Sequence, residues 1–367
     1  MVIFYYMSFL GNLFAKKEKS VVGIDIGSSS LKVVQLRKNH GKAVLETYGE
    51  LALGPYGGGE VGQSTNLSVE QITETLKDLL REAKVTTKSC GVSIPFARSL
   101  LTLVDLPYRE DQKEQKTIIE LEARKYIPVP VSEVQLDWFI VPEMSPSEPV
   151  QNQQTMGKKV EVLLVAVHND EITSLQSIIS GAGLSASFYE IEIFSTIRAV
   201  VEEHIKPVMV LDVGASSTKT YVVERGVVAL SHAINAGSQD ITRAISVSGN
   251  VSLARAEMLK KEEGIDGTGT RGSPEFVFSR IFAEAKRVLM QYETEHKKSI
   301  TSIILTGGGG VTKELGSYAK NIFSIEVQVA NPFAKTEAPA FMHSVLEGIG
   351  PEFAVAVGLA LRKLEEI

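Results

Sequence analysis

The stretch that decides the fold of this 367-residue chain occurs twice in it. Residues 23–34 read GIDIGSSSLKVV, and residues 210–221 read VLDVGASSTKTY. Both copies place an Asp two residues before a Gly, followed by a run of small, mostly polar residues and a Lys. Each copy predicts a β-strand, a tight turn and a second strand. Because an internal repeat of this kind indicates duplicated architecture, we expect two halves with the same fold.

Strands and helices predicted around the two copies define the domain organisation. A third strand follows each copy, at residues 43–51 and 227–234. Within the first half, a predicted insert at about 91–180 alternates strands and helices and contains an excursion at 142–158, rich in Pro and Gln. The predicted parts are a tail (1–20), a first domain (21–205) that carries the insert, a second domain (206–349) with a smaller subdomain at about 239–300, and a final helix (350–367) that returns to the first domain.

Composition limits the class of protein. Hydrophobic residues make up 44% and charged residues 22%, which is typical of globular domains and excludes a disordered or fibrous chain. Lys and Arg number 38 against 44 Asp and Glu, so the formal charge of −6 argues against nucleic acid as a partner. The single cysteine, Cys90, cannot form an internal disulfide, so the chain suits a reducing compartment.

The first 14 residues are apolar and aromatic. The run is shorter than the roughly 20 residues that a membrane span requires, and its lysines follow it, which is the wrong order for a signal peptide. Two interpretations stay open: a short amphipathic foot on a membrane surface, or a frayed terminus with Met7 as the true start. We expect any contact with a membrane to come through a partner.

The repeated turns predict a site for a phosphorylated ligand. A turn of Gly and Ser points successive backbone N–H groups at one spot, and such a nest binds phosphate oxygens. Asp25 and Asp212 end their strands facing the same space, where two carboxylates would repel each other and the phosphates unless a cation, expected to be Mg²⁺ held partly through water, lay between them. Lys32 adds a positive charge for a phosphate oxygen. The alternative is a pair of ordinary hairpins without a ligand.

A glycine run is the third element of this site. The buried strand at 303–306 opens into four glycines, whose bare backbone lets a flat base or a phosphate lie against the chain. Other motifs are absent or misplaced. No Gly-x4-Gly-Lys-Ser/Thr sequence occurs, which excludes a P-loop, and the Gly-x-Gly-x-x-Gly match at 57–62 lies several residues before the next helix, so we treat it as chance. Scattered His residues and the lack of Gly-x-Ser-x-Gly disfavour zinc chemistry and serine hydrolysis.

With these features in place, the chain resembles the actin/Hsp70/sugar-kinase superfamily of ATP-binding proteins. Within it, residues 23–32, residues 119–138 with their Tyr-Ile-Pro…Leu-Asp-Trp pattern, and residues 354–362 are similar to the PilM family, the cytoplasmic actin-like proteins of type IV pilus assembly. FtsA of the divisome is a near relative of that family. The resemblance runs from about Val21 to the C-terminus. It implies an α/β, actin-like ATPase fold of two duplicated, RNase H-like domains (1A and 2A), with an FtsA-type 1C insert and a 2B subdomain.

The resemblance also implies roles for single residues. Asp25 and Asp212 are similar to the Mg²⁺-facing carboxylates. The phosphate loops correspond to Gly27, Ser28, Ser29 and Lys32 and to Gly214, Ala215 and Ser216, and the adenosine loop to Gly307, Gly308, Gly309 and Gly310. Glu257 and Lys260 match a pair that reaches the ribose and base, and an exposed helical salt bridge is the alternative. Glu192 matches a polar position that orients the attacking water, and a solvated carboxylate at a helix N-terminus is the alternative.

Gly358 lies within the predicted final helix, where a Gly costs about 1 kcal/mol relative to Ala. A close crossing of the two helices that connect the domains, which is the hinge of the superfamily, would explain a glycine at this position.

The expected function is that of a nucleotide-switched scaffold. ATP or ADP with Mg²⁺ would sit between the halves, so that nucleotide binding couples to closure. The resemblance implies that the chain binds the cytoplasmic N-terminal tail of an inner-membrane pilus protein, PilN, in a groove between domain 1A and the insert, at the inner face of the cytoplasmic membrane, with at most weak ATPase activity. One alternative is an FtsA-like, self-associating filament former at the membrane. Another is a sugar- or acetate-kinase-type phosphotransferase, for which the sequence indicates neither a base nor a substrate pocket.

Overall fold

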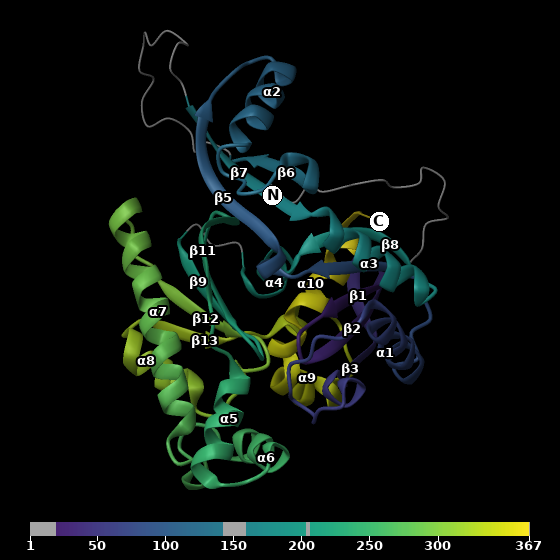
Figure 1. The fold of residues 1–367 in the computed structure, drawn as a ribbon, viewed down its shortest axis with the longest axis vertical. Coiled ribbons are helices and arrows are strands. Elements are labelled where there is room, and N and C mark those ends of the chain that lie inside the picture. Colours follow the sequence, from purple (N-terminus) through teal and green to yellow (C-terminus); the bar gives the residue numbers. More distant parts are fainter. Residues whose placement is uncertain (1–19, 142–158, 203–205, 367) are drawn as a thin grey trace.

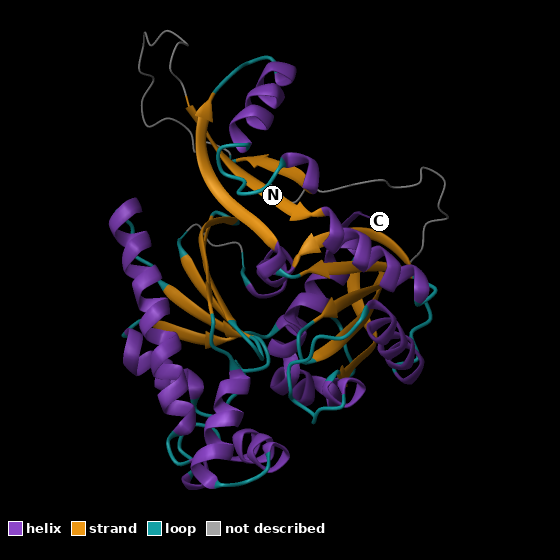
Figure 2. Cartoon of the chain, in the orientation of Figure 1, coloured by secondary structure: helices purple, strands orange, loops and turns teal. Residues whose placement is uncertain are grey.

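The computed structural model describes residues 20–141, 159–202 and 206–366, and it has two lobes with a smaller sheet at one end (Figure 1, Figure 2). The predictions for residues 1–14 and 142–158 lie outside the described residues. Each lobe is built on a mixed five-stranded sheet. Comparing the strand order of the two sheets tests the predicted duplication.

The two five-stranded sheets have the same topology. The first has the order β3-β2-β1-β4-β8, formed by β1 (Ser20–Ile26), β2 (Ser30–Asn39), β3 (Lys42–Ala52), β4 (Ser89–Ile94) and β8 (Ser185–Ile191). The second has the order β11-β10-β9-β12-β13, formed by β9 (Val208–Val213), β10 (Thr218–Glu224), β11 (Val227–Ile234), β12 (Ser302–Thr306) and β13 (Glu326–Val329). Even the register repeats, since Asp25 lies opposite Lys32 and Asp212 opposite Lys219. The duplication is confirmed.

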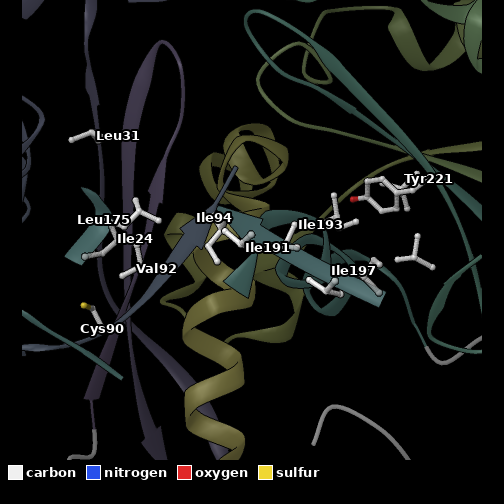
Figure 3. Close-up of a cluster of buried hydrophobic side chains, with 14 of the residues drawn as sticks. Ile24, Leu31, Cys90, Val92, Ile94, Leu175, Ile191, Ile193, Ile197 and Tyr221 are labelled. Carbon is white, nitrogen blue, oxygen red and sulfur yellow. The ribbon is translucent and has the colours of Figure 1, made fainter. Parts of the chain in front are cut away.

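Helices cover both faces of the first sheet, because successive side chains of its strands point to opposite sides. Ile24 and Val33 pack in one core with α1 (Val69–Glu82) and α3 (Asn169–Gly181). Val34 points the other way, into a core with α10 (Ala354–Glu366). The first of these cores continues between the lobes as far as Tyr221 of β10 (Figure 3). Burial of each such aliphatic side chain contributes about 1.5–3 kcal/mol.

The second lobe has its own core and a helical extension. Its helices are α5 (Ser238–Gly249), α6 (Leu253–Glu263), the short η4 (Thr268–Thr270), α7 (Ser273–His296) and α8 (Leu315–Phe323). Phe278 and Tyr292 of α7 are completely buried in a cluster with the strands of this lobe. The helices α5 and α6 extend to the end of the molecule opposite the smaller sheet (Figure 1).

The insert forms a separate antiparallel sheet with the order β5-β7-β6. It contains η2 (Phe96–Arg98), β5 (Ser99–Pro107), α2 (Gln112–Ala123), η3 (Val131–Glu133), β6 (Val134–Ile140) and β7 (Lys159–His168). The predicted limits of about 91–180 were too wide. β4 belongs to the five-stranded sheet of the first lobe, and α3 packs with that lobe's core.

Two helices, α4 (Glu192–Val200) and α10, cross in close contact between the lobes. A Cβ on Gly358 would lie only 1.9 Å from the carbonyl oxygen of Ser195, so glycine alone fits and the predicted close crossing is confirmed. Next to it, buried Glu190 accepts hydrogen bonds from Arg198 of α4 at 2.8 Å and from Arg362 of α10 at 2.9 Å. This buried ion network ties the two helices to β8.

In the described part of the chain, the helical run Ala340–Glu366 is long and apolar enough to cross a membrane, with a mean hydropathy of 1.5. However, 61% of its most apolar window is buried inside the molecule. We therefore interpret this run as a core segment, which packs α10 against β1, β2 and β4.

Short elements carry the chain from β13 back to the first lobe. They are η5 (Pro332–Lys335), η6 (Ala340–Met342), α9 (His343–Ile349) and η7 (Gly350–Phe353). On the way, the N–H of Glu337 donates to Ala43 O at 2.7 Å and its carbonyl accepts from Leu45 N at 2.9 Å. Glu337 therefore occupies the outer edge of β3.

Candidate functional site

The two repeated turns face one cavity of about 840 Å³ between the lobes. They have the same local geometry: Gly27 N donates to Ser30 O at 3.1 Å, and Gly214 N donates to Ser217 O at 3.0 Å. The turns also touch, because Ser216 Oγ lies 3.1 Å from Ser28 Oγ. The two turns therefore meet at one place, as a shared site requires.

Backbone amides at the tips of the turns are available to a ligand. In the part of the chain that the structure describes, the N–H groups of Ser28, Ser29, Ala215 and Ser216 donate no hydrogen bond. All four residues line the cavity. Two nests of free amides facing each other form a cradle for the oxygens of a polyphosphate.

Asp25 and Asp212 lie at the ends of β1 and β9, and both line the cavity. Asp25 Oδ1 accepts a hydrogen bond from Ser93 Oγ at 3.0 Å. Burial raises the pKa of Asp25 to about 6, against the opposing effect of Lys32. This carboxylate is therefore costly to charge in the absence of a cation.

Lys219 links two of the predicted residues. Its Nζ lies 3.1 Å from Asp212 Oδ2 and 2.6 Å from Glu192 Oε2. Burial alone would lower the pKa of Lys219, but the two carboxylates outweigh it and raise the pKa. The other oxygen of Glu192 accepts from Phe96 N at 2.7 Å, and the side chain is 12% exposed. Glu192 is thus a partly buried, paired carboxylate, and the alternative of a solvated one was wrong.

Lys32 reaches the cavity from β2. Its Nζ donates to Ser30 Oγ at 2.7 Å and forms an ion pair of 3.1 Å with Glu50 of β3. Burial opposes the charge on Lys32, but Glu50 and Asp25 raise its pKa. Beside Glu50 lies Glu352 of η7, whose pKa is raised to about 7 by burial and by the charge on Glu50.

Glu257 and Lys260 form a buried pair on the wall contributed by α6. Lys260 Nζ lies 2.6 Å from Glu257 Oε2, and Thr242 Oγ1 donates to the same oxygen at 2.6 Å. Burial lowers the pKa of Lys260. The pair has the i,i+3 spacing of a helical salt bridge, but it lines the cavity, so the alternative of an exposed surface pair was wrong.

The glycine run after β12 divides into two parts. Gly307 and Gly308 line the cavity. Gly307 has a φ of +81°, and a Cβ there would lie 2.4 Å from Asp212 Oδ1. Gly309 and Gly310 do not line the cavity, because they pack against Val213 and the backbone of Thr306, which a Cβ would approach to 2.3 and 2.5 Å. The other fourteen predicted site residues all line the cavity.

Several cavity residues were missed in the sequence. Lys219 could have been predicted, because it is the lysine of the second copy of the repeat. Glu50, Glu352 and Lys261 belong to no sequence motif that would predict them. The loop between β3 and α1, which begins with η1 (Gly54–Gly57), is also part of the wall: Gly62, at a φ of +86°, lies against the carboxylate of Glu257 in the other lobe. This contact joins the two lobes at the wall of the cavity.

The residues present fit a magnesium nucleotide. The free amides and Lys32 suit phosphate oxygens, and Asp25 and Asp212 supply carboxylate oxygens for the ion. Among the described residues no group of three or more His, Cys, Asp or Glu side chains could hold a metal by itself. Mg²⁺ commonly keeps several waters and binds through one or two carboxylates plus substrate phosphates, which this donor set matches.

Comparisons with known proteins place the chain in a family. The family model of type IV pilus assembly protein PilM matches residues 23–364. A chain of a solved PilM–PilN type IV pilus biogenesis complex superposes with a TM-score of 0.78 at 25% identity, covering 94% of this chain and 98% of that one. The cell division protein FtsA of Neisseria meningitidis serogroup B is 23% identical, over 95% of this chain and 92% of FtsA.

A more distant structure bears on the fold alone. MreB5 of Spiroplasma citri, solved with bound AMPPNP, superposes with a TM-score of 0.54 at 11% identity, covering 96% of this chain and 98% of that one. The expected actin-like fold is confirmed by these superpositions. Because the family model spans nearly the whole described chain, this protein belongs to the PilM family of type IV pilus assembly proteins.

Proposed function

We propose that this chain is a nucleotide-switched scaffold of type IV pilus assembly. It holds ATP or ADP with Mg²⁺ between its lobes and binds the cytoplasmic N-terminal tail of a PilN-like inner-membrane protein. The observation that carries the nucleotide part is the pair of facing turns, one from each lobe, with free amides at their tips.

The roles of the cavity residues follow from their positions. The amides of Ser28, Ser29, Ala215 and Ser216 bind phosphate oxygens, and Lys32 balances their charge. Asp25 and Asp212 hold the Mg²⁺, which supplies positive charge between the carboxylates and the phosphates. Glu257, Lys260, Gly307 and Gly308 lie on the walls where the ribose and base fit. Because the ligand contacts belong to both lobes, nucleotide binding favours their closure.

Glu192 is proposed to position the water for hydrolysis, and we expect it to hold that water weakly. Both of its oxygens are already engaged, one by Lys219 at 2.6 Å and the other by Phe96 N at 2.7 Å. A water would have to compete with these two charged or well-aligned donors. We therefore expect hydrolysis to be slow, so that nucleotide occupancy rather than turnover sets the state of the scaffold.

The partner-binding part rests on the family and on two open strand edges. The similar PilM was solved in a complex with PilN. In this chain β6 ends the small sheet and β8 ends the first-lobe sheet. Arg362 of α10 stacks 4.3 Å from the ring centre of Phe188 on β8, and its charge acts on Asp137 of β6, whose pKa burial raises. An extended tail laid between these edges would use a known mode of peptide capture.

Such a partner would hold the protein at the inner face of the cytoplasmic membrane. The experiment that tests the whole proposal is calorimetry of Mg-ATP, and then of a PilN tail peptide, with the full chain. Asp25→Ala is expected to weaken Mg-ATP binding by roughly tenfold, about 1.4 kcal/mol, and to remove the effect of nucleotide on tail binding. Asp78→Ala, on α1 outside the cleft, is the control.

Unchanged Mg-ATP affinity in Asp25→Ala would remove that residue from the site. Two further outcomes would replace the scaffold function. Pelleting of the protein with Mg-ATP and lipid would favour the FtsA-like filament, and stoichiometric phosphorylation of a small acceptor would favour the phosphotransferase.

A further inference from the structure

A second cavity, of about 440 Å³, lies between the small sheet and the second lobe. Its walls include consecutive residues of two strands, 101–105 of β5 and 228–231 of β11. β5 is the end strand of the small sheet, and β11 is the end strand of the second-lobe sheet (Figure 1). Two open sheet edges therefore border one space, which we call the β5–β11 slot.

The edge of β5 is suited to pairing with another strand. β5 runs for nine residues against β7 in one unbroken register. Natural edge strands are usually protected by Lys, Pro or a bulge, and in β5 the one such feature is Pro107, its last residue. The register of β11, by contrast, shifts at Val222/Val223 of its partner strand. Within the described residues, no backbone hydrogen bond joins β5 to β11.

The lining of the slot is apolar at one end and acidic at the other. Leu101, Leu103 and Leu230 contribute apolar surface. At the acidic end, Asp105 lies directly opposite Glu161 in the register of β5 and β7, and Glu295 of α7 lines the same cavity. Like charges directly opposite each other on a sheet are destabilising. In the part of the chain described, none of the three carboxylates forms an ion pair, and Lys159 nearby forms none with them.

We propose that the β5–β11 slot binds an extended peptide segment of a partner protein by strand addition to β5. Apolar side chains of the segment pack against Leu101, Leu103 and Leu230, and a Lys or Arg of the segment neutralises Asp105 and Glu161. β11 and the end of α7 form the opposite wall of the slot.

This site is separate from the one proposed for the pilus-protein tail. The strand order β5-β7-β6 puts the two open edges of the small sheet on opposite sides of β7. The tail would lie at β6, next to the first lobe, whereas the slot lies at β5, next to the second lobe. The inference therefore does not depend on nucleotide binding or on the identity of the tail.

The test is fluorescence anisotropy with the full chain and a blocked, labelled peptide, Val-Lys-Val-Thr-Val-Lys. A matched peptide carries Glu in place of both Lys. The Lys peptide is expected to bind at least tenfold more tightly than the Glu peptide. The double variant D105N/E161Q should abolish this preference, and the control E120Q/E133Q, on the same subdomain but outside the slot, should keep it.

Labelling gives the position of the bound peptide. Because Cys90 is buried, a cysteine introduced by Ser231→Cys in the slot can be labelled alone with an environment-sensitive dye. Its emission should change with the Lys peptide, whereas a dye at Ser279→Cys, exposed on α7 outside the slot, should not respond.

Four outcomes would overturn the proposal. The first is absence of binding or equal binding of both peptides, and the second is an unchanged preference in D105N/E161Q. The third is displacement of the Lys peptide by the PilN tail, which would put it at β6. The fourth is that this protein fills its own slot. A second copy would be the occupant if the protein forms a dimer that Asp105→Lys dissociates, and residues 1–19 would be the occupant if their deletion tightens peptide binding.

Discussion

Ser216 Oγ lies 3.1 Å from Ser28 Oγ, although the two serines are 188 positions apart in the sequence. One hydroxyl belongs to each lobe, so their contact changes with the angle between the lobes. The amides beside them are the proposed phosphate donors. A phosphate bound there would separate the two hydroxyls or replace their contact. Nucleotide binding would then change the angle between the lobes through this contact.

The contact between Gly62 and Glu257 can be tested with a matched pair of glycines in one loop. Gly62→Ala would place a Cβ 2.9 Å from Glu257 Cδ, whereas Gly58→Ala would meet nothing within 4 Å. Both glycines have positive φ, so both substitutions carry a similar backbone strain of about 1 kcal/mol. We expect Gly62→Ala alone to lower Mg-ATP affinity, measured by calorimetry, by about threefold or more, because it displaces a buried carboxylate. Equal affinities of the two variants would contradict this role.

The helix crossing predicts a large loss of stability on a small change. Gly358→Ala would bring a Cβ to 1.9 Å from a backbone oxygen that cannot move without displacing α4. Overpacking of this kind costs about 1–3 kcal/mol, and we expect the upper end in urea unfolding. Gly316→Ala in α8 is the control, since its Cβ would meet only Val329 at 3.7 Å, and a helical Gly→Ala gains up to about 1 kcal/mol. A Gly358→Ala variant as stable as the wild type would contradict the close crossing.

The raised pKa of Glu352 predicts a pH dependence of stability without nucleotide. Its folded-state pKa of about 7 lies above the ordinary 4.5, so the folded chain binds this proton more tightly than the unfolded chain. The free energy of unfolding should therefore fall as pH rises from about 4.5 to about 7, by about 1–2 kcal/mol for this group. Asp25, whose pKa is raised to about 6, acts in the same direction.

Glu352→Gln keeps a neutral side chain and should flatten that decline between pH 4.5 and pH 7 in urea unfolding. Glu347→Gln, exposed on α9, should leave it unchanged. The same slope in wild type and in Glu352→Gln would show that this carboxyl does not hold the proton.

The Tyr126–Trp138 segment is expected to serve partner binding more than nucleotide binding. Ile127 and Val134 belong to the buried core of the insert, but Tyr126 is 42% exposed. Tyr126→Ser should weaken binding of the PilN tail peptide severalfold and leave Mg-ATP binding unchanged. Leu121→Ser is the control, since Leu121 is also exposed but lies on α2, outside the segment. Equal losses of tail and nucleotide affinity in Tyr126→Ser would mean that the segment only supports the fold.

The duplicated halves could be predicted because a tight turn that exposes its amides needs Gly and small residues at fixed positions, and this requirement is local. Gly358 was informative for a similar reason, since a Gly inside an apolar helix has a cost that only a close contact explains. No local pattern predicted β8, β13, α8 or α9, whose order in space depends on packing.

Most of the predicted site residues line one cavity, but the sequence did not predict which charged groups pair inside it. Glu50 and Glu352 come together from β3 and η7, segments far apart in the chain, and no spacing rule predicts such a pair. The burial of Glu257 and Lys260 could not be predicted either, because the i,i+3 spacing of a salt bridge is the same on a buried and on an exposed helix. The four adjacent glycines also have two different environments, since only Gly307 and Gly308 line the cavity.

Glu337 occupies part of the outer edge of β3, so a neighbouring molecule cannot add a strand to the first-lobe sheet at this place. With both its backbone groups bonded to residues 43 and 45, β3 offers no continuous ladder at this place to a neighbouring molecule. The lobe is left with β8 as its other border, so growth by sheet extension can proceed in one direction only.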